Sequence, residues 1–89
     1  METWYFYLAR CSDGSLYAGV CVDLKQREAA HNAGTGAKYT RGRRPVCIVY
    51  SERCTSKSTA MKREHEVKKW SKQKKKRLIE NGREGGVCR

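Results

Sequence analysis

Residues 4–21 read WYFYLARCSDGSLYAGVC, in which two runs of aromatic and branched side chains flank Ser12-Asp13-Gly14. Such runs on either side of a turn sequence predict a β-hairpin. Because side chains alternate along a strand, a two-residue turn at Asp13-Gly14 would put Tyr7 and Tyr17 on opposite faces of the sheet. A three-residue loop with Gly14 in the left-handed conformation would put both tyrosines on one face, and we favour this loop.

The residues that follow predict one helix, one loop and a third strand. Asp23 begins a capping-box pattern and Gly34 is a stop signal, which together predict a helix from about Leu24 to Ala33. A flexible loop is expected from Gly34 to Pro45, and residues 46–50 have the branched and aromatic composition of a strand.

The last third of the chain predicts two more helices. Ser56 or Ser58 can cap a helix that runs to about Trp70, and Ser71 can cap a final short helix through Ile79. The order strand, strand, helix, strand, helix, helix indicates an α+β fold in which helices cover a small antiparallel sheet.

Length and charge limit the architecture and the kind of partner. Because 89 residues leave room for one modest core, we expect a single domain over residues 1–80 and a flexible C-terminal tail over residues 81–89. Twenty Lys and Arg against nine Asp and Glu give a formal net charge of +11. Self-repulsion makes this surplus costly unless the partner is a polyanion, so nucleic acid is the expected partner.

The sequence also bears on location and on the state of the cysteines. The longest apolar run, from Trp4 to Ala9, is too short to cross a bilayer, and the N-terminal residues do not resemble a secretion signal. We therefore expect a cytoplasmic protein without a membrane partner. The five cysteines are odd in number, and reduced thiols are expected.

A basic loop is the expected nucleic-acid contact. Residues 38–44 combine four cations with Tyr39, which suits phosphate contacts together with base stacking. The alternative is an ordinary solvated charged loop. The residues expected to touch nucleic acid are Lys38, Tyr39, Thr40, Arg41, Arg43 and Arg44, with Lys68 from the later basic segment.

Four side chains before this loop suit hydrolytic chemistry. Tyr7 and Tyr17 can hold or deprotonate a water molecule, although tyrosine is also common in ordinary sheets. Arg27 and His31 lie four residues apart on the predicted helix, where they can stabilise phosphate charge and transfer a proton. The alternative for this second pair is a solvated helix face.

Glu64 is the expected metal ligand. On a helical wheel it lies between Met61 and Ala60, within the apolar face of its helix. A hard cation such as Mg²⁺ can be bound through one carboxylate, with water and phosphate oxygens as its other ligands. The alternative is an i,i+4 salt bridge between Glu64 and Lys68.

Together these residues resemble the GIY-YIG nuclease family in order and spacing. The motifs are Tyr5-Phe6-Tyr7, Tyr17-Ala18-Gly19, Arg27, His31 and Glu64, and the resemblance covers roughly Trp4 to Ile79. The stretch from His31 to Pro45 is similar to that of the stand-alone bacterial single-domain type, and also to that of structure-selective nucleases that resolve branched DNA.

The resemblance implies a fold, an activity and a role for each site residue. The fold is an α/β-sandwich with a central three-stranded antiparallel sheet, and the activity is metal-dependent hydrolysis of DNA, on branched or single-stranded substrates. Tyr7 and Tyr17 would position or deprotonate the nucleophile, and which of them is the base stays open. Arg27 would stabilise the phosphate, His31 would assist proton transfer, and Glu64 would bind a single Mg²⁺ or Mn²⁺ ion.

Two departures from the family pattern support a second hypothesis. The first motif is Tyr5-Phe6-Tyr7 rather than Gly-Ile-Tyr. Family members usually have an asparagine about a dozen residues after the glutamate, and Lys76 stands near that position here. The alternative function is therefore a DNA-binding module that keeps the nuclease fold with little or no cleavage. Members of the family often take their specificity from an attached domain, which leaves room for a protein partner in that role.

Overall fold

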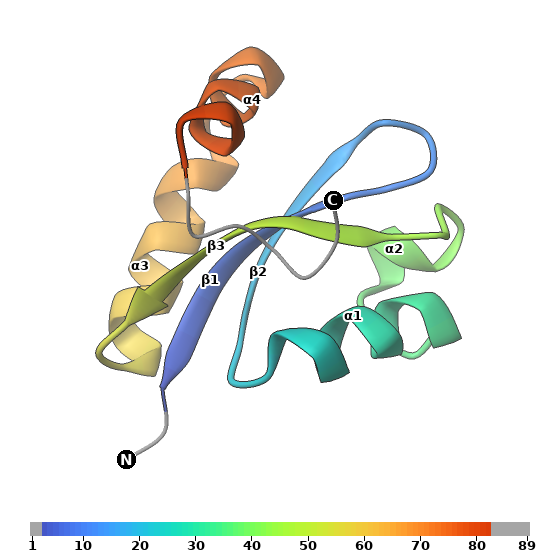
Figure 1. Ribbon diagram of the computed structural model, residues 1–89, viewed down its shortest axis with the longest axis horizontal. Coiled ribbons are helices and arrows are strands. Elements are labelled where there is room, and N and C mark those ends of the chain that lie inside the picture. The colour runs from blue at the N-terminus through green and yellow to red at the C-terminus, as the bar shows by residue number, and fades with distance from the viewer. Residues whose placement is uncertain (1–2, 83–89) are drawn as a thin grey trace.

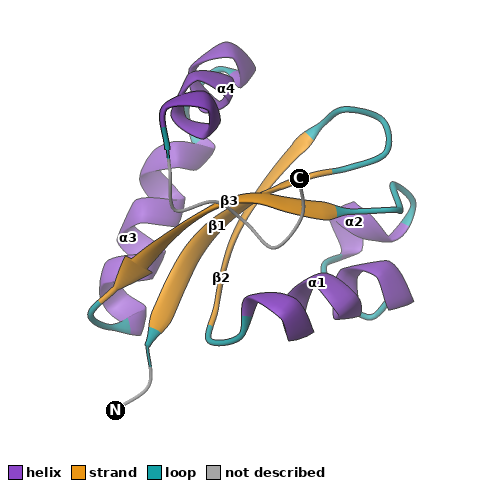
Figure 2. Ribbon diagram, viewed as in Figure 1, coloured by secondary structure: helices purple, strands orange, loops and turns teal. Residues whose placement is uncertain are grey.

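A central antiparallel sheet with helices on both faces makes up the computed structural model, which describes residues 3–82 (Figures 1 and 2). The sheet has the strand order β2-β1-β3. Figure 1 shows α1 and α2 on one side of the sheet and α3 and α4 on the other. The predicted α+β fold with a three-stranded antiparallel sheet is confirmed. The elements are β1 (Trp4–Arg10), β2 (Leu16–Cys21), α1 (Leu24–Ala33), α2 (Lys38–Arg41), β3 (Cys47–Cys54), α3 (Lys57–Lys68) and α4 (Lys72–Asn81).

The hairpin of β1 and β2 has the register that a three-residue loop requires. Tyr7 pairs with Gly19 and Ala9 pairs with Tyr17. Gly14 has a φ of 83°, in the left-handed region that glycine adopts without strain. Since alternate residues share a face, Tyr7 and Tyr17 lie on the same side of the sheet, as predicted.

Side-chain caps determine where α1 begins and glycine determines where it ends. The Asp23 carboxylate accepts a hydrogen bond from the backbone N–H of Gln26 at 3.0 Å. Gly34 follows the helix with a φ of 84°, and α1 therefore has the predicted bounds. Helix α3 begins after Ser56 and α4 after Ser71, so Ser56 rather than Ser58 is the cap.

Strand β1 is buried on both faces, which explains its unbroken run of apolar residues. Tyr7 and Ala9 pack with Val46 and Ile48 in the core beneath α1. The intervening residues Phe6 and Leu8 pack with Val67 in the core beneath α3. The two cores share the central strand, so each helical layer is positioned relative to the other through β1.

Two segments differ from the predicted secondary structure. The segment expected to be an irregular flexible loop contains α2, a single turn that begins after Ala37. One turn is too short to show apolar periodicity in the sequence. Strand β3 continues to Cys54 because Glu52 and Arg53 pair with Phe6 and Tyr5, and these polar residues carried no strand signal. The predicted tail lies outside the described residues except for Asn81, which ends α4, and Gly82.

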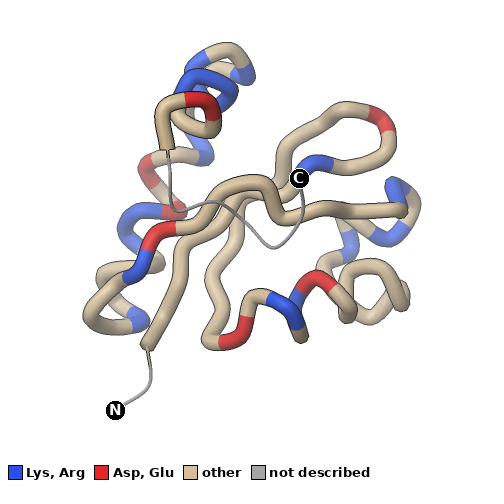
Figure 3. The backbone as a smooth tube through the Cα atoms, viewed as in Figure 1, with Lys and Arg blue, Asp and Glu red and all other residues tan. Residues whose placement is uncertain are grey.

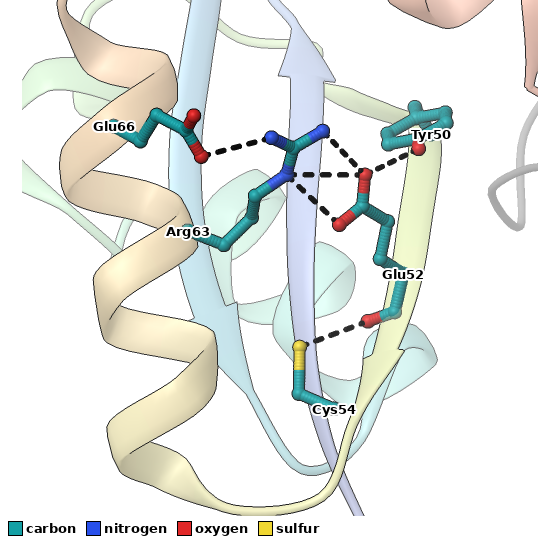
Figure 4. Close-up of polar contacts among 5 residues, drawn as sticks. All are labelled: Tyr50, Glu52, Cys54, Arg63 and Glu66. Atoms are coloured by element: carbon teal, nitrogen blue, oxygen red, sulfur yellow. Dashed lines mark hydrogen bonds and ion pairs between the residues drawn. The ribbon is translucent and has the colours of Figure 1, made fainter.

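An arginine joins α3 to the sheet (Figure 4). Arg63 donates hydrogen bonds to both carboxylate oxygens of Glu52 on β3, each at 3.0 Å, and to Glu66 at 2.9 Å. The Tyr50 hydroxyl also donates to Glu52, and the hydrogen bond to Glu52 raises the pKa of Arg63. A bidentate arginine–carboxylate pair is directional, so this contact orients α3, the helix that carries Glu64.

The described residues include three free thiols, Cys11, Cys21 and Cys54. Cys47 is disulfide-bonded, so the expectation that every cysteine is reduced is wrong at that position. Among residues 3–82, no helix has both the length and the apolar character needed to cross a membrane.

Candidate active site

Four of the five predicted catalytic residues come together on the face of the sheet beneath α1. The Tyr7 hydroxyl oxygen lies 2.8 Å from Nε2 of His31, and Arg27 Nε donates a hydrogen bond to the same oxygen at 3.2 Å. The Tyr17 ring centroid lies 6.3 Å from that of Tyr7 and 5.5 Å from that of His31. The structure therefore builds one polar cluster from β1, β2 and α1.

Helical spacing and two glycines make this cluster possible. Arg27 and His31 project from one side of α1 because they are four residues apart. A Cβ atom on Gly19 would lie 2.5 Å from the Tyr7 hydroxyl, and one on Gly36 would lie 2.5 Å from Nδ1 of His31. Side chains at these two positions would displace the phenol and the imidazole. Gly19 belongs to a recognised motif, whereas nothing in the sequence pointed to this role of Gly36.

Burial sets the protonation states of the cluster. Tyr7 and His31 are both 0% exposed. Burial raises the pKa of Tyr7 to about 12 even though the hydrogen bond from Arg27 lowers it. Burial, together with the positive charge of Arg27, lowers the pKa of His31. At neutral pH the cluster therefore contains a neutral phenol, a neutral imidazole and a charged guanidinium.

A stack of side chains from residues 38–44, called the α2 segment below, covers Tyr17. The Tyr39 ring stacks on the Tyr17 ring at 5.7 Å between centroids, and the Arg43 guanidinium lies 4.1 Å above Tyr39. Arg43 Nε also donates to the Asp13 carboxylate at 3.0 Å. The hairpin loop thus holds Arg43, and through it Tyr39, against the surface of the site. Asp13 was expected only as a turn residue, so its second contact was missed.

Most of the predicted nucleic-acid contacts are accessible, but Thr40 is not. Lys38, Arg41 and Arg44 are exposed, and Tyr39 is 41% exposed. Figure 3 shows basic residues clustered around α2 and along α4. Thr40 is 0% exposed and its hydroxyl lies 2.8 Å from Nδ1 of His31. Its placement contradicts the expected surface contact, because Thr40 faces inward from the turn that carries its basic neighbours.

Glu64 lies on α3, at the other face of the sheet from α1. It is 19% exposed along its side chain and pairs with Lys68 at 3.2 Å, so the alternative salt bridge is present. Its neighbours Ala60 and Val67 are fully buried, whereas Met61 is 47% exposed, so Glu64 lies at the edge of the buried face and the predicted apolar face is wrong at Met61. Within residues 3–82, Glu64 has no hydrogen bond or ion pair to the four clustered residues, and Lys68 lies apart from the α2 segment.

The donor set on α3 suits one mode of metal binding. No group of three or more His, Cys, Asp or Glu in the described part of the chain can hold an ion. A single carboxylate matches the way Mg²⁺ is usually held, through one or two carboxylates with water and substrate phosphates. Glu64 therefore fits an ion that arrives with a phosphate substrate, and the residues do not form a protein cage.

Comparison with known proteins identifies the family. The family model described as the GIY-YIG catalytic domain matches residues 3–77. A UPF0213 protein of Staphylococcus saprophyticus is 51% identical over 82 residues, which are 92% of this chain and 100% of the relative. A UPF0213 protein of Staphylococcus aureus is 52% identical over 79 residues, covering 89% of this chain and 96% of that protein.

Solved structures agree with this result. The solution NMR structure of a UPF0213 protein from Bacillus halodurans has 43% identity and a TM-score of 0.57, and covers 90% of this chain and 86% of its own. The solution NMR structure of a protein from E. faecalis has 41% identity and the same TM-score of 0.57, covering 88% and 84%. The chain therefore belongs to the GIY-YIG family and is similar to the UPF0213 proteins over 92% of its length.

Proposed function

We propose that the protein is a metal-dependent endonuclease that hydrolyses phosphodiester bonds in DNA. The observation that carries the proposal is the hydrogen-bonded chain from Arg27 through Tyr7 to His31, which lies beside the basic α2 segment. A charged guanidinium, a phenol and a neutral imidazole in series can hold a phosphate and move a proton. Membership of the GIY-YIG family supports the same reaction class.

The exposure and the charge of each clustered side chain indicate its role in the proposed reaction. Nε of Arg27 donates a hydrogen bond to the Tyr7 hydroxyl. Arg27 also lines an open groove of about 360 Å³, together with Trp4 and Gln26. Its remaining N–H donors can bind a phosphate in that groove. Tyr17 is only half-buried, so it is the phenol that a substrate or an attacking water meets first. Tyr7 lies behind it and connects Arg27 to His31.

Glu64 is proposed to hold a single Mg²⁺ or Mn²⁺ ion together with a substrate phosphate. When bound, such an ion polarises the phosphoryl oxygens and neutralises charge on the leaving group. Lys68 neutralises the Glu64 carboxylate in the absence of the ion. Binding of the ion would exchange one cation for another at this carboxylate.

The decisive experiment is a cleavage assay on purified protein. Labelled single-stranded, duplex, flap and junction DNA would be incubated with the protein, with and without Mg²⁺ or Mn²⁺. We expect nicking that depends on the metal on at least one branched or single-stranded substrate. Absence of metal-dependent nicking on all four substrates would reject the enzyme and favour a binding module. The Glu64–Lys68 ion pair, with no hydrogen bond or ion pair from Glu64 to the clustered residues among residues 3–82, is the observation that favours that alternative.

Binding is expected to depend on Arg41 and Arg44, whose side chains are exposed. Replacing both with alanine should reduce the slope of log Kobs against log salt by roughly 0.9 per lost phosphate contact on duplex DNA. Replacing both with lysine keeps the charge and should keep the slope. Fluorescence anisotropy at several salt concentrations measures this, and an unchanged slope in the alanine variant would mean that the segment faces away from DNA.

Arg43 is left intact in that experiment because its guanidinium holds the stack over Tyr17, whereas Arg44 makes one longer hydrogen bond, from Nη1 to the Asn32 carbonyl at 3.3 Å. Arg43 donates to the Asp13 carboxylate at 3.0 Å and to the Tyr39 carbonyl at 2.7 Å. Loss of Arg43 would disturb the stack over Tyr17 as well as remove a charge. A change in the salt dependence of DNA binding by an Arg43 variant would therefore not report the loss of a phosphate contact alone.

A further inference from the structure

Thr40 is a buried polar residue in direct contact with the cluster, and it has no established role. It lies in α2, is 0% exposed, and places its hydroxyl oxygen 2.8 Å from Nδ1 of His31. The same hydroxyl donates a hydrogen bond to the carbonyl of Ala37 at 2.9 Å. Thr40 therefore touches the imidazole on the side opposite to Tyr7.

The directions of these hydrogen bonds follow from counting protons. A threonine hydroxyl has one proton, and Thr40 gives it to Ala37, so the same oxygen must accept from Nδ1–H of His31. The neutral ring then has a free lone pair on Nε2, which accepts the proton of the Tyr7 hydroxyl. The Tyr7 oxygen in turn accepts from Arg27 Nε–H.

The opposite tautomer would leave a proton without an acceptor. If Nε2 of His31 carried the hydrogen, it would donate to the Tyr7 oxygen, which already accepts from Arg27. The Tyr7 hydroxyl proton would then have no acceptor at a position that is 0% exposed. Within residues 3–82, no buried side-chain nitrogen or oxygen lacks a partner, which agrees with the first assignment.

We propose that Thr40 is a positioning residue that holds His31 in the tautomer with hydrogen on Nδ1, so that Nε2 accepts the Tyr7 proton. Packing also restricts the ring, because Gly36 lies so close to it that a Cβ atom there would lie 2.9 Å from Cα of His31 and 2.5 Å from its Nδ1. The contribution of Thr40 is therefore the direction of the hydrogen bonds. Burial keeps the imidazole neutral at neutral pH by lowering the pKa of His31.

The test reads the tautomer directly by NMR on ¹⁵N-histidine-labelled protein. Two-bond ¹H–¹⁵N correlation spectra distinguish a ring with hydrogen on Nδ1 from one with hydrogen on Nε2. The wild-type protein is expected to show hydrogen on Nδ1 of His31. Thr40→Val, which has the same shape but no hydroxyl, should shift the ring toward hydrogen on Nε2, and Thr40→Ser should restore the wild-type pattern. Amide spectra of each variant check that the fold is kept.

The expected effect of Thr40→Val on cutting rests on the proposed function, whereas the expected tautomer of His31 does not. With Mn²⁺ and a labelled junction DNA, we expect Thr40→Val to lower kcat at unchanged KM by about 10- to 100-fold, by analogy with the loss of a residue that orients a metal-bound imidazole. Wild-type hydrogen on Nε2, or an unchanged tautomer ratio in Thr40→Val, would overturn the proposal. The wild-type spectrum decides the first point even if Thr40→Val does not fold. Failure of the wild-type protein to cut would reject the endonuclease and leave the tautomer result standing.

Discussion

Glu64→Ala is expected to abolish metal-dependent cutting while DNA binding is retained. Glu64 is the carboxylate proposed to hold the ion, and it lies on α3, away from the exposed arginines of the α2 segment. Removing it therefore removes the proposed metal ligand without removing a cation. Only the i,i+4 pair with Lys68 is lost, which costs about 0.3–0.5 kcal/mol. Cleavage assays with Mn²⁺, together with anisotropy on the same DNA, measure both effects.

Glu66→Ala is the matched control for this variant. Glu66 lies on the same helix and forms an ion pair with Arg63 at 2.9 Å, but its side chain is 58% exposed. Loss of this surface pair should cost about 0.2–1 kcal/mol and leave cutting intact. Normal cutting by Glu64→Ala, or equal loss in both variants, would show that Glu64 is a salt-bridge residue and not the metal ligand.

Local chemistry explains why much of the fold could be predicted. Gly14 and Gly34 have positive φ angles that other residues adopt only with strain, and Asp23 caps α1 through one short hydrogen bond. These signals act within a few residues, so they can be seen in the sequence. Gly14 sets the hairpin register, and the register puts Tyr7 and Tyr17 on one face.

The features that were missed depend on tertiary contacts. Thr40 stands among cations, and only the fold shows that one turn of helix directs it inward to His31. The polar residues at the end of β3 belong to a strand because Glu52 binds Arg63 on α3. Neither partnership has a fixed spacing along the chain. The position of Glu64 beside the buried residues Ala60 and Val67 could be predicted from helical periodicity, but its place on the face of the sheet opposite α1 could not (Figure 1).

Tyr7→Phe and Tyr17→Phe are both expected to lower the cutting rate by about 10²–10⁴-fold, the usual contribution of acid–base catalysis. They should differ in stability. Tyr7→Phe leaves Nε2 of His31 buried without its donor, which costs about 1–3 kcal/mol. The hydroxyl of Tyr17 has no hydrogen bond within residues 3–82, so Tyr17→Phe should change stability by less than about 0.5 kcal/mol. Normal cutting by either variant would refute the role assigned to that tyrosine.

Alkaline unfolding provides a separate test of the buried phenol. Burial raises the pKa of Tyr7 from 10.0 to about 12, so the folded protein keeps this proton at pH values where the unfolded chain has lost it. The stabilisation is complete below pH 10 and is lost as pH rises toward 12. Wild-type stability should therefore fall more steeply across this window than that of Tyr7→Phe, which has no proton to lose. Urea denaturation at a series of pH values measures both slopes, and parallel slopes would mean that water reaches the phenol.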